Sequence, residues 1–355
     1  MTDTPVTLNV ALVGYGYAGK TFHAPLISGV PGLNLAAICS SHAETVAADY
    51  PSVKVSGSLD ELLGDTAINT VVIATPNHTH FDLAQRALLA GKHVVVDKPF
   101  TVTSAQAIEL KALSEKAGLV LSAFHNRRWD ADFLTLRALI ASGKLGRISS
   151  LESRFDRFRP EVKLRWREQN GEGTGLWYDL GPHLLDQALL LFGCPVAIQA
   201  KFEMQRTGAQ AVDYFHVTLR YAQQEVILHA GLLEEYETPR YVLRGAEGEY
   251  TKYGLDTQES DLKRGEFGFG PAWGQDPRNG KIRLSAEHGH NSSVVPNLRG
   301  DYRQFYAGFR DAVLSGGDSP VQLNDAVMNI RLLELAVESA RGECKLPVPA
   351  YSQVV

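Results

Sequence analysis

Short apolar runs alternate with helical stretches over the first 125 residues. The run Leu8–Val13 is almost wholly apolar, which is typical of a strand buried on both faces of a parallel sheet. The stretch from His80 to Ala90 is amphipathic and is followed by Gly91, a residue type that commonly ends a helix. This alternation indicates βαβ units around a parallel sheet. The other expected strands are 33–38, 70–74, 93–96 and 119–123, and the other expected helices cover about 20–28, 43–49 and 104–116.

Beyond residue 125 the strands become longer and more alternating, as in an antiparallel sheet with one face toward solvent or an interface. We therefore predict two domains: residues 1–125 form an α/β domain with a parallel sheet, and residues 126–355 form an α+β domain with a large, mainly antiparallel open sheet. The region 251–297 has weak periodicity and is expected to be rich in loops. Strands are expected at 148–155, 198–205, 214–221, 225–231 and 241–244, and helices at 131–142, 302–314 and 325–341.

Composition narrows the class of protein. The 355 residues are 44% hydrophobic and 21% charged, which argues against a disordered or coiled-coil chain. The net charge of −5 disfavours a nucleic-acid binder that relies on neutralising phosphates. No run approaches the roughly 20 apolar residues of a membrane span, and the three cysteines show no paired spacing. We expect a cytoplasmic protein that binds neither nucleic acid nor membrane.

A glycine-rich turn follows the first expected strand. Gly14, Gly16 and Gly19 form a G-x-G-x-x-G pattern that includes Tyr17 and Ala18 and precedes the next expected helix. The first glycine allows a tight turn, the second lets the backbone approach a pyrophosphate, and the third lets helix and strand pack closely. The amides of the helix N-terminus then face the phosphates. The pattern alone is weak, but its place in a βα series predicts a dinucleotide site.

The end of the second strand bears on which dinucleotide binds. An NAD site places an acidic residue there for the ribose 2′-hydroxyl. In this chain Ser40 and Ser41 occupy the turn, and no acid occurs until Glu44. Hydroxyls can bind a 2′-phosphate, and Lys20 could add positive charge, so the turn favours NADP over NAD. In the alternative interpretation, the two serines simply begin a loop.

Two further segments carry candidate chemistry. Asp97-Lys98-Pro99 follows the strand 93–96, at the carboxyl edge where open α/β sheets bind ligands. A lysine there can supply positive charge to a developing alkoxide. In the second domain Asp179, His183 and Asp186 have i, i+4, i+7 spacing on an expected helix.

His183 suits proton transfer near neutral pH, and a nearby carboxylate would orient it. Pro182 belongs in a first helical turn or at a kink, so we expect Asp179 to lie just before the regular helix. Taken alone, the segment also fits a polar helix start with a structural histidine. The combination with Lys98 favours a catalytic group.

Together these segments resemble the Gfo/Idh/MocA oxidoreductases over nearly the whole chain. The usual Glu-Lys-Pro of that family is Asp-Lys-Pro here. Within the family the chain is most similar to the NADP-dependent scyllo-inositol dehydrogenase branch, on the basis of 22–25, 39–41 and 126–130. The motifs are Gly14-x-Gly16-x-x-Gly19, Thr75-Pro76-Asn77-x-x-His80, Asp97-Lys98-Pro99, Asn126-Arg127-Arg128 and Asp179-x-Gly181-x-His183-x-x-Asp186.

The resemblance implies a Rossmann domain, a C-terminal α+β domain, and hydride transfer between a nicotinamide and a sugar or cyclitol. It implies that Lys98, Asp179 and His183 are catalytic, with His183 the acid/base. It also implies a homodimer or homotetramer formed through the C-terminal sheet. Cofactor contacts are expected from Gly14, Gly16, Tyr17, Ala18, Gly19, Ser40, Ser41, Thr75, Pro76, Asn77, His80 and Lys98, and substrate contacts from Lys98, Asn126, Arg127, Trp129, Trp166, Asp179 and His183.

Several alternatives remain open. His78-x-His80 and His288-x-His290 could chelate a metal, but neither has clustered cysteines or carboxylates nearby, so no metal is expected. Arg127 could bridge the domains rather than bind substrate, and Trp166 and Tyr236 could be ordinary packing residues. The protein could also act on another sugar or keto-sugar, cleave glycosides with a tightly held NAD, or bind the cofactor as a non-catalytic regulator.

Overall fold

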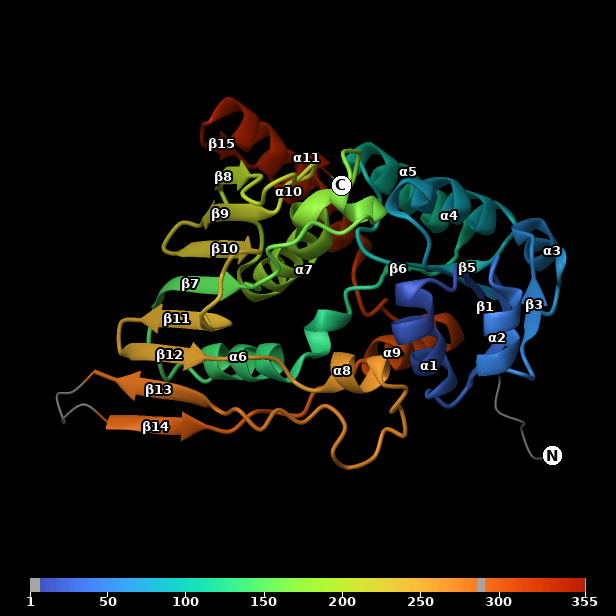
Figure 1. Cartoon of the computed structure of the whole chain (residues 1–355), viewed down its shortest axis with the longest axis horizontal. Coiled ribbons are helices and arrows are strands. Elements are labelled where there is room, and N and C mark those ends of the chain that lie inside the picture. The colour runs from blue at the N-terminus through green and yellow to red at the C-terminus, as the bar shows by residue number, and fades with distance from the viewer. Residues whose placement is uncertain (1–6, 286–290, 355) are drawn as a thin grey trace. The chain divides into compact units, whose positions relative to one another are not determined.

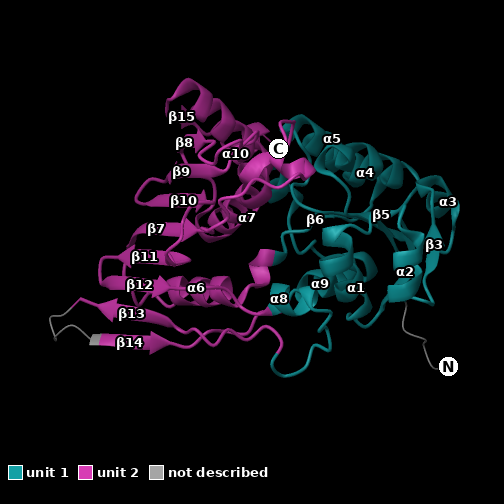
Figure 2. Cartoon of the chain, in the orientation of Figure 1, with its two compact units in different colours: residues 1–126, 258–272, 302–327 teal, residues 127–257, 273–301, 328–355 magenta. Residues whose placement is uncertain are grey.

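The computed structural model describes residues 7–285 and 291–354, which group into two compact units (Figure 2). The first unit comprises residues 1–126, 258–272 and 302–327, and the second comprises 127–257, 273–301 and 328–355. The sequence placed one boundary after residue 125. The structure adds to the first unit two later segments that the sequence had placed in the second domain.

The first unit is built on a parallel sheet of six strands. These are β1 (Leu8–Val13), β2 (Leu33–Cys39), β3 (Lys54–Ser56), β4 (Thr70–Ile73), β5 (His93–Val96) and β6 (Leu121–Ala123). Their order is β3-β2-β1-β4-β5-β6, and every neighbouring pair is parallel. The chain therefore runs outward in both directions from the β1/β4 pair, and such a switch point is where open α/β sheets bind ligands.

Helices cover both faces of this sheet. They are α1 (Ala24–Ser28), α2 (Ala43–Asp49), α3 (Leu59–Gly64), α4 (His80–Leu89), α5 (Ser104–Ala117), α8 (Gln258–Lys263) and α9 (Arg303–Ser315), with the π-helical turn η1 (Gly19–His23) and the 3-10 turn η2 (Asn77–Thr79). Figure 1 shows α4 and α5 together on one side of the sheet and α1 with α9 on the other. α5 begins with a capping box, in which Thr103 and Gln106 each bind the other's backbone amide.

The second unit contains a sheet of nine strands. These are β7 (Ile148–Arg154), β8 (Ala197–Glu203), β9 (Tyr214–Arg220), β10 (Glu225–Gly231), β11 (Tyr241–Gly245), β12 (Gly248–Lys252), β13 (Gly280–Leu284), β14 (Asn291–Val295) and β15 (Leu346–Pro347). The order is β14-β13-β12-β11-β7-β10-β9-β8-β15, and among the described strands of this second sheet only the β7/β10 pair is parallel. The predicted parallel and mainly antiparallel sheets are thus both confirmed. The predicted loop region 251–297 is wrong in part, because it contains α8, β13 and β14.

Helices pack on one face of the nine-stranded sheet. They include α6 (Ala131–Ala141), α7 (Gly175–Phe192) and α10 (Leu323–Gly342); the short elements are η3 (Asn126–Trp129), η4 (Trp166–Glu168) and α11 (Tyr351–Val354). The buried Trp177 on α7 lies edge-on to Phe215 of β9, with ring centres 4.9 Å apart, and its indole N–H donates to Leu333 O of α10. This residue therefore joins the sheet to both helices.

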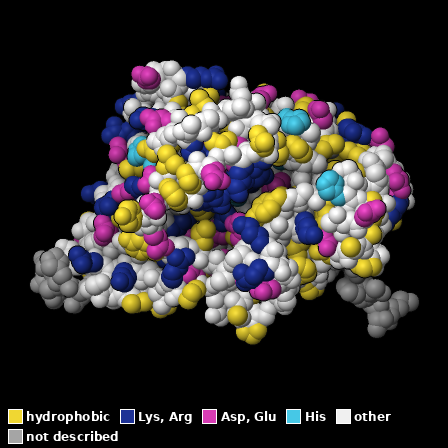
Figure 3. All heavy atoms as spheres, viewed as in Figure 1, with side chains coloured by type: hydrophobic (Ala, Val, Ile, Leu, Met, Phe, Trp, Pro, Cys, Tyr) yellow, Lys and Arg dark blue, Asp and Glu magenta, His cyan; other side chains and the backbone are white. Residues whose placement is uncertain are grey.

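Along β9 the side chains alternate between buried and partly exposed, as expected of a sheet with one covered face. On the face of the molecule seen in Figure 3, acidic side chains are scattered, whereas Lys and Arg side chains also gather in one group near the centre of the view. Within the described residues, no helix combines the length and the apolar character needed to cross a membrane.

Candidate active site

Three loops lie side by side at the carboxyl edge of the six-stranded sheet, because the hydrogen bonding continues past the strand ends. Ala74 N donates to Val13 O, and Asp97 N donates to Ile73 O, each over 2.8 Å. The glycine loop, the loop after β4 and the loop after β5 are therefore neighbours. The sequence had placed the loop after β5, Asp97-Lys98-Pro99, at this edge.

The three glycines of the first loop have three different physical reasons to be glycine. Gly14 has a φ of +97°, and a Cβ there would lie 2.5 Å from Ala74 O. A Cβ on Gly19 would lie 2.1 Å from Gly14 O, so Gly19 is needed for the helix to pack on the loop. A Cβ on Gly16 would meet nothing within 4 Å. The chain itself does not require glycine at position 16, and the open space over its backbone fits a pyrophosphate.

The helix after the loop begins at Tyr17 and Ala18 and widens into the π turn η1. Tyr17 is half exposed, and its hydroxyl donates to Glu259 Oε1 over 3.1 Å. Lys263 Nζ lies 5.6 Å from the Tyr17 ring centre and 2.6 Å from Glu259 Oε1. The short helix α8 therefore reaches the glycine loop, a contact the sequence analysis missed because the partners are more than two hundred positions apart.

The turn after β2 presents hydroxyls and an imidazole. Ser40 Oγ accepts a hydrogen bond from His42 N, and Ser41 Oγ lies 3.0 Å from His42 Nδ1. The Ser40 hydroxyl proton can still donate to a ligand. These groups could bind a phosphate and do not repel one.

Lys20 does not supply the free positive charge that the sequence suggested. Its Nζ lies 2.7 Å from Asp49 Oδ2, which also accepts a 2.8 Å hydrogen bond from Tyr15 OH. The hydrogen bond from Lys20 lowers the pKa of Asp49, with help from Tyr15. The ammonium is thus already paired with a carboxylate, and the argument for NADP rests on the serines.

His80 ties the loop after β4 to the loop after β5. It is fully buried, with Nδ1 2.8 Å from Pro99 O and Nε2 3.0 Å from Thr75 O. Burial lowers the pKa of His80, although Asp97 and the two carbonyls favour the charged form. The sequence placed His80 in direct contact with the cofactor. The structure places the ring beneath the surface, where it positions two backbone carbonyls.

The remaining residues of the β4 loop support its shape. Thr79 Oγ1 donates to Pro76 O and lies 2.6 Å from Thr75 Oγ1, and Asn77 is buried at the start of η2. In the next loop Asp97 Oδ1 accepts from Lys98 N over 2.8 Å. Lys98 is therefore fixed at its backbone by the carboxylate of the preceding residue.

In the second unit α7 carries Asp179, His183 and Asp186. The helix runs without a break from Gly175 to Phe192 with Pro182 inside it, so the prediction that Asp179 precedes the regular helix is wrong. His183 and Asp186 are buried. Asp179 Oδ1 lies 3.5 Å from Arg167 Nη1, so the carboxylate faces a cation.

Arg167 lies on a strap, residues 156–172, for which the sequence predicted no position in the fold. Its guanidinium is 5.1 Å from the centre of the Trp166 ring, which is about one-third exposed. The buried Arg206 holds this strap through an ion pair to Glu168 at 3.0 Å. Arg206 is itself held by an ion pair to Asp213, also at 3.0 Å. Arg167 and Trp166 are thus presented by an anchored segment. Tyr236 is almost fully exposed.

Two neighbouring residues of α7, Asp186 and Gln187, bind the turn η3. Arg128 makes a bidentate pair with the buried Asp186, with a shortest distance of 2.7 Å. Gln187 Nε2 donates to Arg127 O over 3.0 Å. Asp186 is therefore a structural partner of Arg128.

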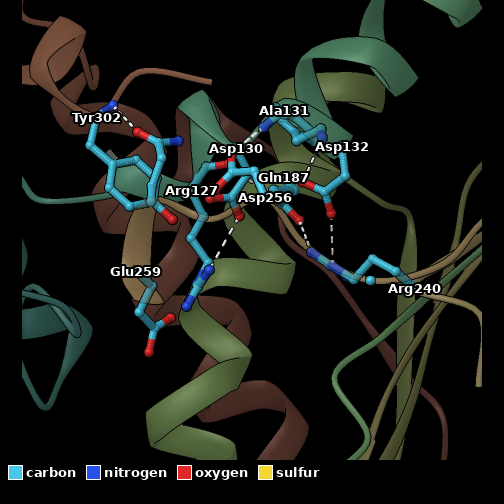
Figure 4. Close-up of polar contacts among 12 residues, drawn as sticks. Arg127, Asp130, Ala131, Asp132, Gln187, Arg240, Asp256, Glu259 and Tyr302 are labelled. Atoms are coloured by element: carbon cyan, nitrogen blue, oxygen red, sulfur yellow. Dashed lines mark hydrogen bonds and ion pairs between the residues drawn. The ribbon is translucent and has the colours of Figure 1, made fainter. Parts of the chain in front are cut away.

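Around this turn the polar side chains form a connected network (Figure 4). Arg127 points to Asp130, with 3.3 Å between Nη1 and Oδ2, and Arg240 reaches both Asp132 and Gln187. Asn126 is buried at the start of η3, and Trp129 O accepts from Asp301 N. The turn that carries Asn126, Arg127 and Trp129 is thus rigidly held.

The two histidine pairs considered as metal ligands differ in what can be said. His78 is exposed whereas His80 is buried against two carbonyls. His288 and His290 lie outside the described residues. Within the part of the chain that the structure covers, no three His, Cys, Asp or Glu side chains gather as a metal site.

Comparison with known proteins assigns both units. Residues 8–125 match the family model described as "Oxidoreductase family, NAD-binding Rossmann fold", and residues 137–348 match "Oxidoreductase family, C-terminal alpha/beta domain". The chain belongs to the Gfo/Idh/MocA oxidoreductase family. The predicted resemblance is confirmed, and the protein is a nicotinamide-dependent oxidoreductase that acts on CH–OH groups.

Two relatives and one structure show the extent of the similarity. The oxidoreductase YdgJ of Escherichia coli K12 is 52% identical over 96% of this chain and 98% of its own. The scyllo-inositol 2-dehydrogenase (NADP(+)) IolW of Bacillus subtilis 168 is 37% identical over 94% of each chain. A solved oxidoreductase from Yersinia pestis is 50% identical, with a TM-score of 0.94 over 97% of this chain and 98% of that one. The similarity is therefore end to end.

Proposed function

We propose that this family member is an NADP(H)-dependent dehydrogenase that transfers a hydride between nicotinamide and a ring hydroxyl carbon of a cyclitol or sugar, with scyllo-inositol as the substrate. The observation that carries the proposal is the position of Lys98. It follows β5 directly, at the same sheet edge as the glycine loop, and its backbone is fixed by Asp97. The name and 37% identity of IolW support the substrate.

The chain's own residues suit the dinucleotide. The open space over Gly16 would admit a pyrophosphate, and the amides at the start of the following helix would donate to it. Tyr17 and Ala18, with the loop Thr75, Pro76 and Asn77, would line the same edge. The hydroxyls of Ser40 and Ser41 support NADP over NAD, since that turn carries no carboxylate. When bound, the nicotinamide accepts or supplies the hydride at its C4.

The roles of the side chains follow from their chemistry. The Lys98 ammonium binds the substrate oxygen and stabilises the negative charge that develops on it. His183 takes the hydroxyl proton in oxidation and returns it in reduction, so that one proton leaves with each hydride. Asp179 orients His183, and Arg167 faces the same carboxylate. Asn126, Arg127, Trp129 and Trp166 are proposed substrate contacts.

The test is a cofactor-by-substrate screen with purified protein. We expect NADPH formation from NADP⁺ with scyllo-inositol, less product with NAD⁺, and loss of turnover in Lys98→Ala without loss of NADPH binding. Lys116→Ala, on the exposed end of α5, is the matched control and should leave turnover unchanged. Turnover with another sugar would replace the substrate, and none with any polyol would favour a non-catalytic cofactor-binding regulator.

We also propose a cytoplasmic homodimer or homotetramer formed through the outer face of the nine-stranded sheet. That face carries charges that are already neutralised, as in the pairs of Glu152 with Arg154 and Arg244 at 2.9 and 2.6 Å. The free Cys39, Cys194 and Cys344 suit a reducing compartment. Light scattering after size exclusion would measure the subunit number, and a monomer would contradict the proposal.

A further inference from the structure

A buried polar chain lies behind Lys98 in the first unit. Its members are Tyr306 on α9, His23 in the π turn η1, and Asp97 at the end of β5. His23 and Tyr306 are almost completely buried, and Asp97 is only 7% exposed. Nothing in the cofactor or hydride chemistry described above uses His23 or Tyr306.

The contacts connect these groups in a line. Tyr306 OH lies 2.6 Å from His23 Nδ1, and His23 Nε2 lies 3.7 Å from Asp97 Oδ1. The same Asp97 oxygen accepts the backbone N–H of Lys98 over 2.8 Å. Among the described residues, His23 Nε2 has no partner within hydrogen-bond distance, and the charged group that faces it is this carboxylate. This series of contacts therefore ends at Lys98, whose side chain carries the proposed catalytic amine.

The chemistry of the groups favours one tautomer of His23. The Asp97 carboxylate faces Nε2 at 3.7 Å, beyond hydrogen-bond distance, and its negative charge favours an N–H over a lone pair on that nitrogen. In the neutral ring Nδ1 then accepts, and the Tyr306 hydroxyl donates to it. Burial raises the pKa of Tyr306 well above its usual value, and the charge of Asp97 adds to this, so the phenol keeps the proton it donates.

Packing holds the imidazole in this orientation. The His23 ring lies 4.3 Å from the Phe124 ring, and Phe124 is packed edge-on against Phe305 at 4.9 Å. The π turn ends at His23, and π turns inside helices are often found at functional sites. Phe305 and Tyr306 of α9 thus complete the packing around His23. Both belong to the segment 302–327, which joins this unit late in the chain.

The charge state of Asp97 follows from the same neighbours. Burial would raise the pKa of Asp97, but the facing imidazole of His23, together with Lys98 and His80, lowers it to about 2. His80 belongs to α4, Lys98 to the same loop, and Tyr306 faces the carboxylate from α9. Asp97 therefore stays ionised at all pH values where the protein would work.

We propose that His23 and Tyr306 are positioning residues for Lys98: His23 holds the Asp97 carboxylate as an oriented anion, Tyr306 fixes the His23 ring, and the carboxylate fixes the Lys98 backbone. The catalytic half of this inference rests on the role proposed for Lys98. The structural half, an energetic coupling of His23 to the Asp97 charge, does not depend on any substrate.

The first experiment needs no substrate. Thermal unfolding of the wild type, His23→Phe, Asp97→Asn and the double variant is measured from pH 3 to pH 7. Because the pKa of Asp97 is lower in the folded protein than its usual value of about 4, ionised Asp97 stabilises the fold fully above about pH 4. This stabilisation is lost as the pH falls toward 2. We expect His23→Phe to lower the melting temperature most at neutral pH and least at pH 3, and to have a smaller effect in the Asp97→Asn background. Additive effects at every pH would overturn the proposal.

The second experiment uses turnover. In His23→Phe we expect kcat to fall at least tenfold, with KM and NADPH affinity changed less than threefold. Tyr306→Phe should show the same changes to a smaller extent. Phe305→Leu is the control, because it loosens the same aromatic cluster without removing a polar group. If Phe305→Leu reproduces the fall in kcat, or His23→Phe leaves kcat unchanged, the positioning role is wrong.

The two proposals can fail separately. A wild-type protein with no turnover on any polyol or sugar would refute the proposed function, while the pH-dependent coupling in the melts would still be expected. A wild-type protein with turnover but without coupling between His23 and Asp97 would refute the present inference alone.

Discussion

The glycine loop offers a prediction that separates folding from cofactor binding within four residues. In Gly19→Ala the new Cβ would lie 2.1 Å from Gly14 O, whereas ordinary contacts begin near 3.4 Å, so the loop must move by about 1.3 Å. Overpacking of this kind costs about 1–3 kcal/mol, and the better helix propensity of alanine offsets at most about 1 kcal/mol. We expect a net loss near 2 kcal/mol, which lowers the melting temperature by about 4–8 °C.

Gly16→Ala should behave in the opposite way. Its Cβ meets nothing within 4 Å, so the free energy of unfolding should change by less than about 0.5 kcal/mol or rise slightly. The methyl group would instead occupy the space assigned to the pyrophosphate. We expect the Kd for NADPH to rise at least tenfold, or about 1.4 kcal/mol.

Differential scanning fluorimetry of the apo proteins and fluorescence titration with NADPH would measure both quantities. Gly57→Ala is a suitable control, since its Cβ also meets nothing within 4 Å and it lies outside the glycine loop. Unchanged NADPH affinity in Gly16→Ala would refute the assignment of the open space. If the melting temperature of Gly16→Ala were as low as that of Gly19→Ala, the steric reasoning would be refuted.

Three further predictions concern other parts of the proposed site. Ser40→Asp places a carboxylate on the turn after β2 and should weaken NADPH binding at least tenfold relative to NADH in paired titrations; equal losses for both would contradict the NADP assignment. Arg128→Ala leaves the buried Asp186 carboxylate unpaired and should lower the free energy of unfolding by about 3–5 kcal/mol in urea titrations, and a loss below about 1 kcal/mol would show that the pair is not buried in solution. Arg167→Ala removes the cation next to Asp179 and should raise KM for the polyol about tenfold, with NADPH affinity changed less than twofold; an unchanged KM would exclude Arg167 from the substrate site.

The parallel sheet was predictable because its information is local. β1 and β5 have the predicted limits, since a continuous apolar run marks a strand buried on both faces and a glycine or a charged residue follows it. The edge strand β14 and its neighbour β13 were missed. Their sequences GKIRL and NSSVV are short and largely polar, so the apolar signal was too weak.

The sequence predicted which loops form the site, but not which side chains pair with one another there. The order of strands brings Gly14 and Lys98 to one edge, and that follows from chain alternation. The pairing of Lys20 with Asp49 does not, because a local pattern shows a charge without showing what neutralises it. For the same reason Arg167 was missed as a partner of Asp179.

Pro182 was misjudged for a different reason. The rule that proline ends a helix reflects one lost hydrogen bond and one steric conflict. On α7 the helix nevertheless continues, with the buried Trp177 packed below and Asn329 donating a 2.8 Å hydrogen bond to Pro182 O. Tertiary contacts therefore outweigh the local preference, which sequence rules cannot anticipate.

The hydrogen bond between His23 and Tyr306 spans 283 positions in the chain. At a synthesis rate of about 5–20 residues per second, the ribosome needs about 15–60 s to deliver the second partner after the first, across the 283 positions between them. During that time the nascent nucleotide-binding unit would expose Phe124 and the cavity for α9. We therefore expect a fragment ending at residue 126 to expose apolar surface and to require the segment 302–327, supplied in the same or a separate polypeptide, before it becomes a stable unit.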